Sequence, residues 1–214
     1  MPLNGADVDN VARCLREPCP ADLAGIAHPR VGYVGVISQK VDIALISALA
    51  QRQPTWQWVF VGPIPGGDDG RMGGSQVAFE TWTALLALPN VHWLGAKSHD
   101  EVGRYMGHMD VNTMPYVIDD RAGGWAHFAY PLKPHEYLAA GLPVVSADMI
   151  DVRRHIDVLE LVDGIDAREA AVARALAGAA PGDVAARQAV AAANSWDGRV
   201  YDLETWFTEL AERS

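Results

Sequence analysis

The sequence contains Tyr130-Pro-Leu-Lys-Pro-His-Glu-Tyr-Leu-Ala-Ala-Gly-Leu-Pro-Val-Val-Ser146, a stretch that predicts a short helix followed at once by a buried strand. Pro134 suits the first helical position, where its missing N–H would have no intrahelical partner, and Gly141 with Pro143 is the expected stop signal. The apolar run from Pro143 to Ser146 is typical of a buried strand. One segment therefore supplies both a helix N-terminus and a strand of a sheet.

The start of this predicted helix carries the groups of an anion site. The amides of Leu132, Lys133 and His135 are expected to lack helical partners, with the positive end of the helix dipole behind them and the Lys133 ammonium alongside. Glu136 follows in the first turn, and its two carboxylate oxygens can accept both hydroxyls of a ribose. These residues predict a nucleotide site, the alternative being that Lys133 and Glu136 merely decorate an amphipathic helix start.

The stretch resembles the nucleotide-sugar-binding signature of the retaining GT-B glycosyltransferases, whose C-terminal halves carry a run like P-x-K-x-x-E-Y-L-A-A-G-x-P-V-V. The matching positions are Pro131, Lys133, Glu136, Tyr137, Leu138, Ala139, Ala140, Gly141, Pro143, Val144 and Val145. Further pieces follow in the family's order, namely the opening segment at 4–7 and four strands at 31–37, 58–63, 90–95 and 110–115. The resemblance covers nearly the whole chain. It implies an α/β fold, with a doubly wound, Rossmann-like parallel sheet in a single domain equivalent to the C-terminal half of a GT-B enzyme.

Composition limits the class of protein and its partners. Of the 214 residues half are hydrophobic, and 27 acidic against 17 basic residues give a net charge of −10. A surface for nucleic acid or an anionic membrane needs clustered Lys and Arg, which this sequence lacks. No signal segment is visible, and no apolar run approaches the ~20 residues of a transmembrane segment. Cys14 and Cys19 alone predict neither a zinc site nor a disulfide framework, which favours a reduced, cytoplasmic setting.

The chain is expected to divide into three segments. Residues 1–29 hold four prolines and predict an irregular lead-in. Residues 30–195 alternate strand and helix patterns, which predicts the Rossmann-like nucleotide-sugar-binding domain, and residues 196–214 predict a C-terminal helix. In the family that this sequence resembles, the segment at 4–7 lies near the middle of the polypeptide. We therefore expect this chain to be the nucleotide half of a two-domain enzyme, whose N-terminal acceptor-binding domain is absent, cut off, or supplied by a partner chain.

The ends of the predicted strands complete the candidate site. Ligands of open α/β sheets lie at the carboxyl ends of strands, so the turn from Gly35 to Lys40 should face the helix of Glu136. As the resemblance implies, the candidate nucleotide-sugar-binding residues are Gly35, Ser38, Lys40, Gly62, Gly95, Tyr130, Pro131, Leu132, Lys133 and Glu136. Lys133 and Glu136 are also the candidate catalytic residues.

The sequence departs from the family pattern at two places. Family members usually carry an arginine right after the first-strand glycine and a lysine six residues after that glycine. Here Val36 replaces the arginine, and Lys40 comes five residues after Gly35, so Lys40 either substitutes for that lysine or is only solvated. Retaining family members commonly carry two glutamates separated by seven residues. If Glu136 is the second of these, the position of the first is occupied by Phe128, which cannot accept hydrogen bonds from sugar hydroxyls. The candidates to compensate are His127, Asp119 and Asp120.

A metal site is not predicted. The D-x-D pair Asp7 and Asp9 falls in the lead-in rather than at a strand end. His92, His99 and His108 lack metal-ligand spacing with Cys or a carboxylate pair. The scheme therefore needs no cofactor, and the nucleotide sugar is a substrate.

The resemblance implies that the chain binds a UDP- or GDP-sugar and transfers the glycosyl group to an acceptor, in cell-surface polysaccharide or glycoconjugate synthesis. Cationic and dipolar groups would stabilise the leaving diphosphate. The alternatives are a non-catalytic nucleotide-sugar-binding module or subunit that needs a separate acceptor-domain partner, and a nucleotide-sugar epimerase. An NAD-dependent oxidoreductase is disfavoured because the G-x-G-x-x-G fingerprint is absent.

Overall fold

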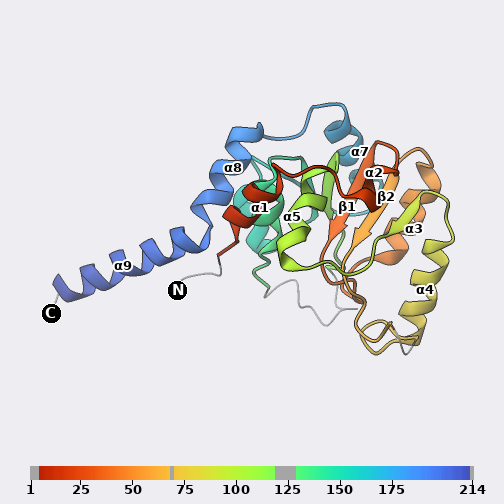
Figure 1. Cartoon of the computed structure of the whole chain (residues 1–214), viewed down its shortest axis with the longest axis horizontal. Coiled ribbons are helices and arrows are strands. Elements are labelled where there is room, and N and C mark those ends of the chain that lie inside the picture. Colours follow the sequence, from red (N-terminus) through yellow and green to blue (C-terminus); the bar gives the residue numbers. More distant parts are fainter. Residues whose placement is uncertain (1–4, 68–69, 119–128, 213–214) are drawn as a thin grey trace.

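A six-stranded parallel sheet forms the centre of the computed structural model, which describes residues 5–67, 70–118 and 129–212 (Figure 1). The strands are β1 Arg30–Val34, β2 Gln57–Val61, β3 Val91–Trp93, β4 Val111–Met114, β5 Val144–Ala147 and β6 Glu160–Val162. Their order across the sheet is β3-β2-β1-β4-β5-β6, and neighbouring strands pair in parallel. The prediction of a doubly wound, Rossmann-like domain is confirmed.

Helices cover both faces of the sheet, which is why β1, β4 and β5 are buried along their whole length. The helices are α1 Val8–Cys14, α2 Ala21–Ala24, α3 Ile43–Arg52, α4 Gln76–Leu86, α5 His99–Gly107, α6 Lys133–Ala139, α7 Ile165–Leu176, α8 Val184–Ala193 and α9 Trp196–Glu212, with a 3-10 helix, η4, at Ile150–His155. One core joins α3, α4 and α7 to the sheet, and the other joins α1, α5, α6 and α8 to it. None of the helices in the described ranges has the length and apolarity needed to cross a lipid bilayer.

The strand order reverses between β1 and β4, and this reversal creates a crevice. The chain builds β2 and β3 on one side of β1 and then returns to build β4 on the other side. Pairing between β1 and β4 covers Val31 and Gly32, so Val34 lies beyond it. The loops that follow these strands are joined to each other, because the Asp42 amide donates to the Pro115 carbonyl at 2.7 Å. The crevice is the place where ligands bind in folds of this kind.

The segment predicted as an irregular lead-in is packed against the domain. Its helices α1 and α2 place Val11 and Leu23 in the core that also contains α5 and α6. The backbone of Ala6 pairs in parallel with Ser195 at the base of α9. The boundary between residues 29 and 30 stays a prediction, but the described part of the lead-in contributes to the packing of the domain.

Helix α9 extends away from the body as a single rod (Figure 1). Four of its aromatic side chains are more than half exposed, with Tyr201 at 69% and Phe207 at 61%. The other two are Trp196 and Trp206. Such a set of exposed aromatic residues is a typical feature of a surface that binds another protein.

Two glycines let the ends of β1 and β2 approach each other. Gly35 and Gly62 both have φ of +146°. The Gly35 amide donates to the Val61 carbonyl at 2.7 Å, and the Gly62 amide donates to the Gly95 carbonyl at 2.8 Å. A Cβ on Gly62 would lie closer than 3.0 Å to the carbonyl oxygen of Gly35. Glycine is therefore required at Gly62 by both its conformation and its neighbour.

We predict that Gly62→Ala lowers the free energy of unfolding by at least about 2 kcal/mol, because the new methyl group meets backbone and the conformation is unfavourable for alanine. Gly25→Ala is the matched control, since Gly25 has φ of −79° and no neighbouring heavy atom within 4 Å. Urea denaturation of both variants measures the difference. Equal stability of the two variants would contradict this account of Gly62.

Candidate nucleotide-binding site

A hollow of about 400 Å³ lies at the crevice between β1 and β4. Its lining residues are Tyr33, Val36, Ser38, Lys40, Tyr116 and Lys133. They come from the end of β1, the turn after it, the segment after β4 and the start of α6. The structure thus brings three predicted site residues, Ser38, Lys40 and Lys133, to one hollow.

Helix α6 is attached to the end of β1 by two side chains. The Val34 amide donates to the Tyr137 hydroxyl at 2.7 Å, and that hydroxyl donates to the Val34 carbonyl at 3.2 Å. The Lys133 ammonium donates to the same carbonyl. Both polar backbone groups of Val34, which lie beyond the pairing with β4, are therefore satisfied by α6.

The Lys133 ammonium is held among aromatic rings rather than by a carboxylate. Its Nζ lies 5.2 Å from the centre of the Tyr33 ring and 5.7 Å from that of Tyr137. Desolvation lowers the pKa of Lys133 from its ordinary value, and the negative charge of Glu136 partly opposes this shift. Within the described ranges no ion pair neutralises Lys133. A partly desolvated cation without a carboxylate partner is well prepared to bind an anion.

The start of α6 differs from the prediction by one residue. The helix begins at Lys133, with Pro134 at its second position and Leu132 as the N-cap. The His135 amide already donates to the Leu132 carbonyl at 3.0 Å, so the prediction that this amide is free is wrong. The reason is that a helix beginning at Lys133 closes its first turn on Leu132. Anion binding by the Leu132 and Lys133 amides stays a prediction.

The other predicted residues are not part of the lining of this hollow. A Cβ on Gly35 would clash with the Lys133 ammonium, so this glycine makes room for the cation. Glu136 is partly buried one position before Tyr137, outside the lining of the hollow, and Pro131 and Leu132 lead into α6. The candidate compensating residues Asp119, Asp120 and His127, and the departure Phe128, lie outside the described residues.

A second hollow, of about 490 Å³, opens where β2 and β3 end. Its lining residues are Pro63, Ile64, Gly67, Phe79, Trp82, Thr83, Leu86, Trp93, Gly95 and Ala96. The Trp93 indole donates to the Gly62 carbonyl at 2.9 Å and remains 42% exposed. Sequence reasoning assigned Gly95 here but missed the face of α4. The signal was present, since residues 79, 82, 83 and 86 follow the spacing of one helical face.

Tyr130 lies outside the first hollow and points toward the base of α9. Its hydroxyl oxygen is 2.8 Å from His135 Nε2, and Arg199 donates to it at 3.2 Å. His135 is 1% exposed, and its ring packs edge-on against His155 with 5.0 Å between centres. Burial, aided by the positive charges around it, lowers the pKa of His135 to about 3. A direct contact of Tyr130 with a nucleotide stays a prediction.

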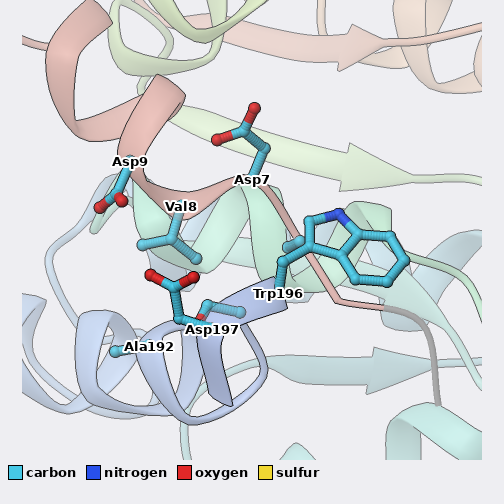
Figure 2. A pocket seen from close by; sticks show the side chains of 8 residues that line it. Asp7, Val8, Asp9, Ala192, Trp196 and Asp197 are labelled. Atoms are coloured by element: carbon cyan, nitrogen blue, oxygen red, sulfur yellow. The ribbon is translucent and has the colours of Figure 1, made fainter. Parts of the chain in front are cut away.

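The D-x-D pair lies at a third, smaller hollow between α1 and α9 (Figure 2). Asp7 points away from Asp9 and Asp197 there, because it caps α1 by accepting from the Asn10 amide at 3.0 Å and also contacts His99 at 3.0 Å. In the described ranges no group of three or more His, Cys, Asp or Glu residues could hold a metal ion. Asp7 therefore has a capping role in the structure.

These features define a Rossmann-like α/β domain with a cation in the crevice where its strand order reverses. The chain belongs to the family of glycosyl transferases group 1, whose sequence model matches residues 28–180. TuaH of Bacillus subtilis strain 168, provisionally named as a teichuronic acid biosynthesis glycosyltransferase, is 32% identical over 146 residues. These residues are 68% of this chain and 33% of TuaH.

Several solved structures share the fold. Sucrose-phosphate synthase from Thermosynechococcus elongatus has a TM-score of 0.74 at 19% identity, over 100% of this chain and 53% of that protein. A glycosyltransferase from Rickettsia africae has a TM-score of 0.72 at 12% identity, over 100% of this chain and 57% of that one. Anabaena Alr3699/HepE, solved in complex with UDP and glucose, has a TM-score of 0.63 at 18% identity, over 96% of this chain and 55% of that one. The chain spans about a third of TuaH and about half of these structures.

The shifted pKa of His135 predicts a loss of stability in acid. Between pH 6.5 and about 3 the unfolded chain binds a proton at this imidazole and the folded chain does not. In that window each unit of acidification therefore removes about 1.4 kcal/mol of stability through this group. We expect His135→Leu to have a flatter stability profile than the wild type between pH 6 and 4, measured by denaturant unfolding. Parallel profiles would contradict the assignment of a buried neutral imidazole.

Proposed function

We propose that this chain is the donor-binding half of a glycosyltransferase, which binds a nucleoside diphosphate sugar and transfers its glycosyl group to an acceptor. The observation that carries the proposal is the Lys133 ammonium, unneutralised by an ion pair among the described residues, in the hollow at the reversal of strand order. Membership of the glycosyl transferases group 1 family supports the reaction class. The name of TuaH supports a role in the synthesis of a cell-surface polysaccharide or glycoconjugate.

The diphosphate of the donor is proposed to bind in the first hollow. Lys133 supplies a cation from one side, and Ser38 and Lys40 supply a hydroxyl and a second cation from the turn after β1. When the glycosidic bond to phosphate breaks, negative charge grows on the departing diphosphate, and fixed cations lower the energy of that charge. Glu136, one turn further along α6, is proposed to accept the hydroxyls of the ribose.

The base is proposed to bind in the second hollow. β1, β2 and β3 are adjacent, and strands lie about 4.8 Å apart, so the ends of β1 and β3 are separated by about 10 Å. This separation suits a diphosphate at Gly35 and a base at Gly95 joined through a ribose. The exposed face of Trp93 offers a stacking surface, and stacking on an aromatic ring tolerates different bases.

The acceptor-binding part of the enzyme is proposed to be a separate domain or a partner chain. The chain spans about half of the solved structures that share its fold. The exposed aromatic residues of α9, among them Trp206 and Phe207, are the proposed contact surface. If transfer requires residues from that other part, the isolated chain is a nucleotide-sugar-binding module, which is the second candidate function.

Calorimetric titration of the chain with UDP, GDP and ADP, with and without Mg²⁺, tests the donor site. We expect saturable binding of UDP or GDP. Lys133→Ala should weaken it about 10-fold or more, because a charge-assisted hydrogen bond contributes about 1.5–3 kcal/mol. Glu136→Ala should weaken it as well. Arg174→Ala and Glu80→Ala are matched controls on exposed helix faces. If both Lys133→Ala and Glu136→Ala bind the nucleotide with wild-type affinity, the assignment of the donor site is contradicted.

Titration with inorganic pyrophosphate, which carries the diphosphate but no base, tests the two hollows separately. Trp93→Ala should weaken binding of the nucleoside diphosphate by about 1–3 kcal/mol through lost base stacking, and should leave binding of pyrophosphate unchanged. Trp93→Phe should keep most of the affinity because it keeps an aromatic face, whereas Lys133→Ala should weaken both ligands. If Trp93→Ala binds the nucleotide normally, the base lies elsewhere.

A further inference from the structure

Helix α9 is joined to the body of the domain at its base. The Ala6 amide donates to the Asn194 carbonyl at 2.9 Å, and the Trp196 amide donates to the Ala6 carbonyl at 3.2 Å. One side chain from the first turn, Arg199, turns inward and is only 13% exposed. The next aromatic residue of the helix, Tyr201, is 69% exposed. The direction in which α9 leaves the body is therefore set by these few contacts.

Arg199 connects this base to the segment that precedes α6. Its guanidinium donates to the Tyr130 hydroxyl at 3.2 Å and to the side-chain oxygen of Asn194. The Tyr130 hydroxyl in turn is 2.8 Å from His135 Nε2. Arg199 to Tyr130 to His135 is thus a continuous polar linkage from α9 to α6.

The linkage ends in α6, the helix that carries two residues of the proposed donor site. His135 is the residue directly before Glu136 and two residues after Lys133, in the same short helix. It is 1% exposed and its ring packs against that of His155, so the surrounding side chains limit its movement. The linkage therefore ends on the short helix that also carries Lys133 and Glu136, the two side chains proposed to hold the diphosphate and the ribose.

Some polar groups of this linkage and its surroundings lack hydrogen-bond partners within the part of the chain that the structure describes. Among the described residues, three buried nitrogens in this cluster lack a hydrogen-bond partner, namely His135 Nδ1, His155 Nε2 and Arg199 Nε. A buried polar network with unmet hydrogen bonds is held less firmly in one arrangement than a complete network. The other terminal nitrogen of Arg199, Nη1, donates to the carboxylate of Asp202 on its own helix at 3.4 Å.

We propose that Arg199 and Tyr130 are positioning residues of the donor site, which couple the direction of α9 to the placement of Lys133 and Glu136. The role assigned to the site rests on the proposed function, whereas the linkage itself does not. Because such coupling is reciprocal, a nucleotide in the donor site also favours one direction of α9.

Hydrogen exchange without nucleotide tests the linkage directly. Arg199→Met should raise amide exchange in residues 135–140 relative to the wild type, and Arg199→Lys should restore part of the protection, because lysine keeps a donor and a charge. Arg174→Met is the matched control, since it removes an exposed guanidinium of α7 that is paired with Glu160 of β6. Unchanged exchange in α6 of Arg199→Met would overturn the inference, whether or not any nucleotide binds.

Nucleotide affinity tests the consequence for the site. Arg199→Met and Tyr130→Phe should each weaken binding about 5-fold or more, the lower limit of usual coupling between sites. The double variant should lose little more than either single variant, because both remove one linkage. Additive losses, or a loss that follows a matching decrease in Tm, would overturn the inference. A wild type that binds no nucleotide would instead contradict the proposed function, and the exchange experiment would still decide on the linkage.

Discussion

The backbone of Val34 is the point on which the candidate site depends. This residue ends β1 just past the positions that pair with β4, so its amide and carbonyl have no strand partner on that side. The Tyr137 hydroxyl and the Lys133 ammonium take the place of the missing strand. An unpaired buried backbone group is costly, and the cost is avoided only if α6 packs where it does. The same contacts that complete the sheet therefore place a cation in the crevice.

The glycines that follow β1 and β2 allow the same close packing at the crevice. Gly35 leaves room for the Lys133 ammonium, and Gly62 leaves room for the carbonyl of Gly35. A larger residue at either position would meet these neighbouring atoms. The shape of the crevice therefore depends on the lack of side chains at these two glycines as well as on the residues that line it.

Much of this arrangement could be predicted from the sequence, because strands and their ends follow local patterns. In a parallel sheet all the carboxyl ends meet at one edge, so locating the strands and the start of the helix that carries Lys133 was enough to bring Ser38, Lys40 and Lys133 together. The start of α6 was less certain, since proline is accepted at either of the first two helical positions and Leu132 gives no capping signal. The direction of Tyr130 could not be predicted. It depends on Arg199, 69 residues further along the chain, and no local pattern records that contact.

The attachment of α9 has a mechanical consequence. A helix of 17 residues is about 25 Å long, and Arg199 is its fourth residue, about 5 Å from the base. Trp206 and Phe207 lie about 15–17 Å from the base, so for a force on these residues the helix is a lever with an arm ratio of about three. A sideways force on them acts on the Arg199 contact about three times more strongly, while a displacement of these residues is reduced by the same ratio. Weak contacts made by the exposed aromatic residues of α9 can in this way compete with the hydrogen bond between Arg199 and Tyr130. Large displacements of the outer part of α9 correspond to small shifts at α6.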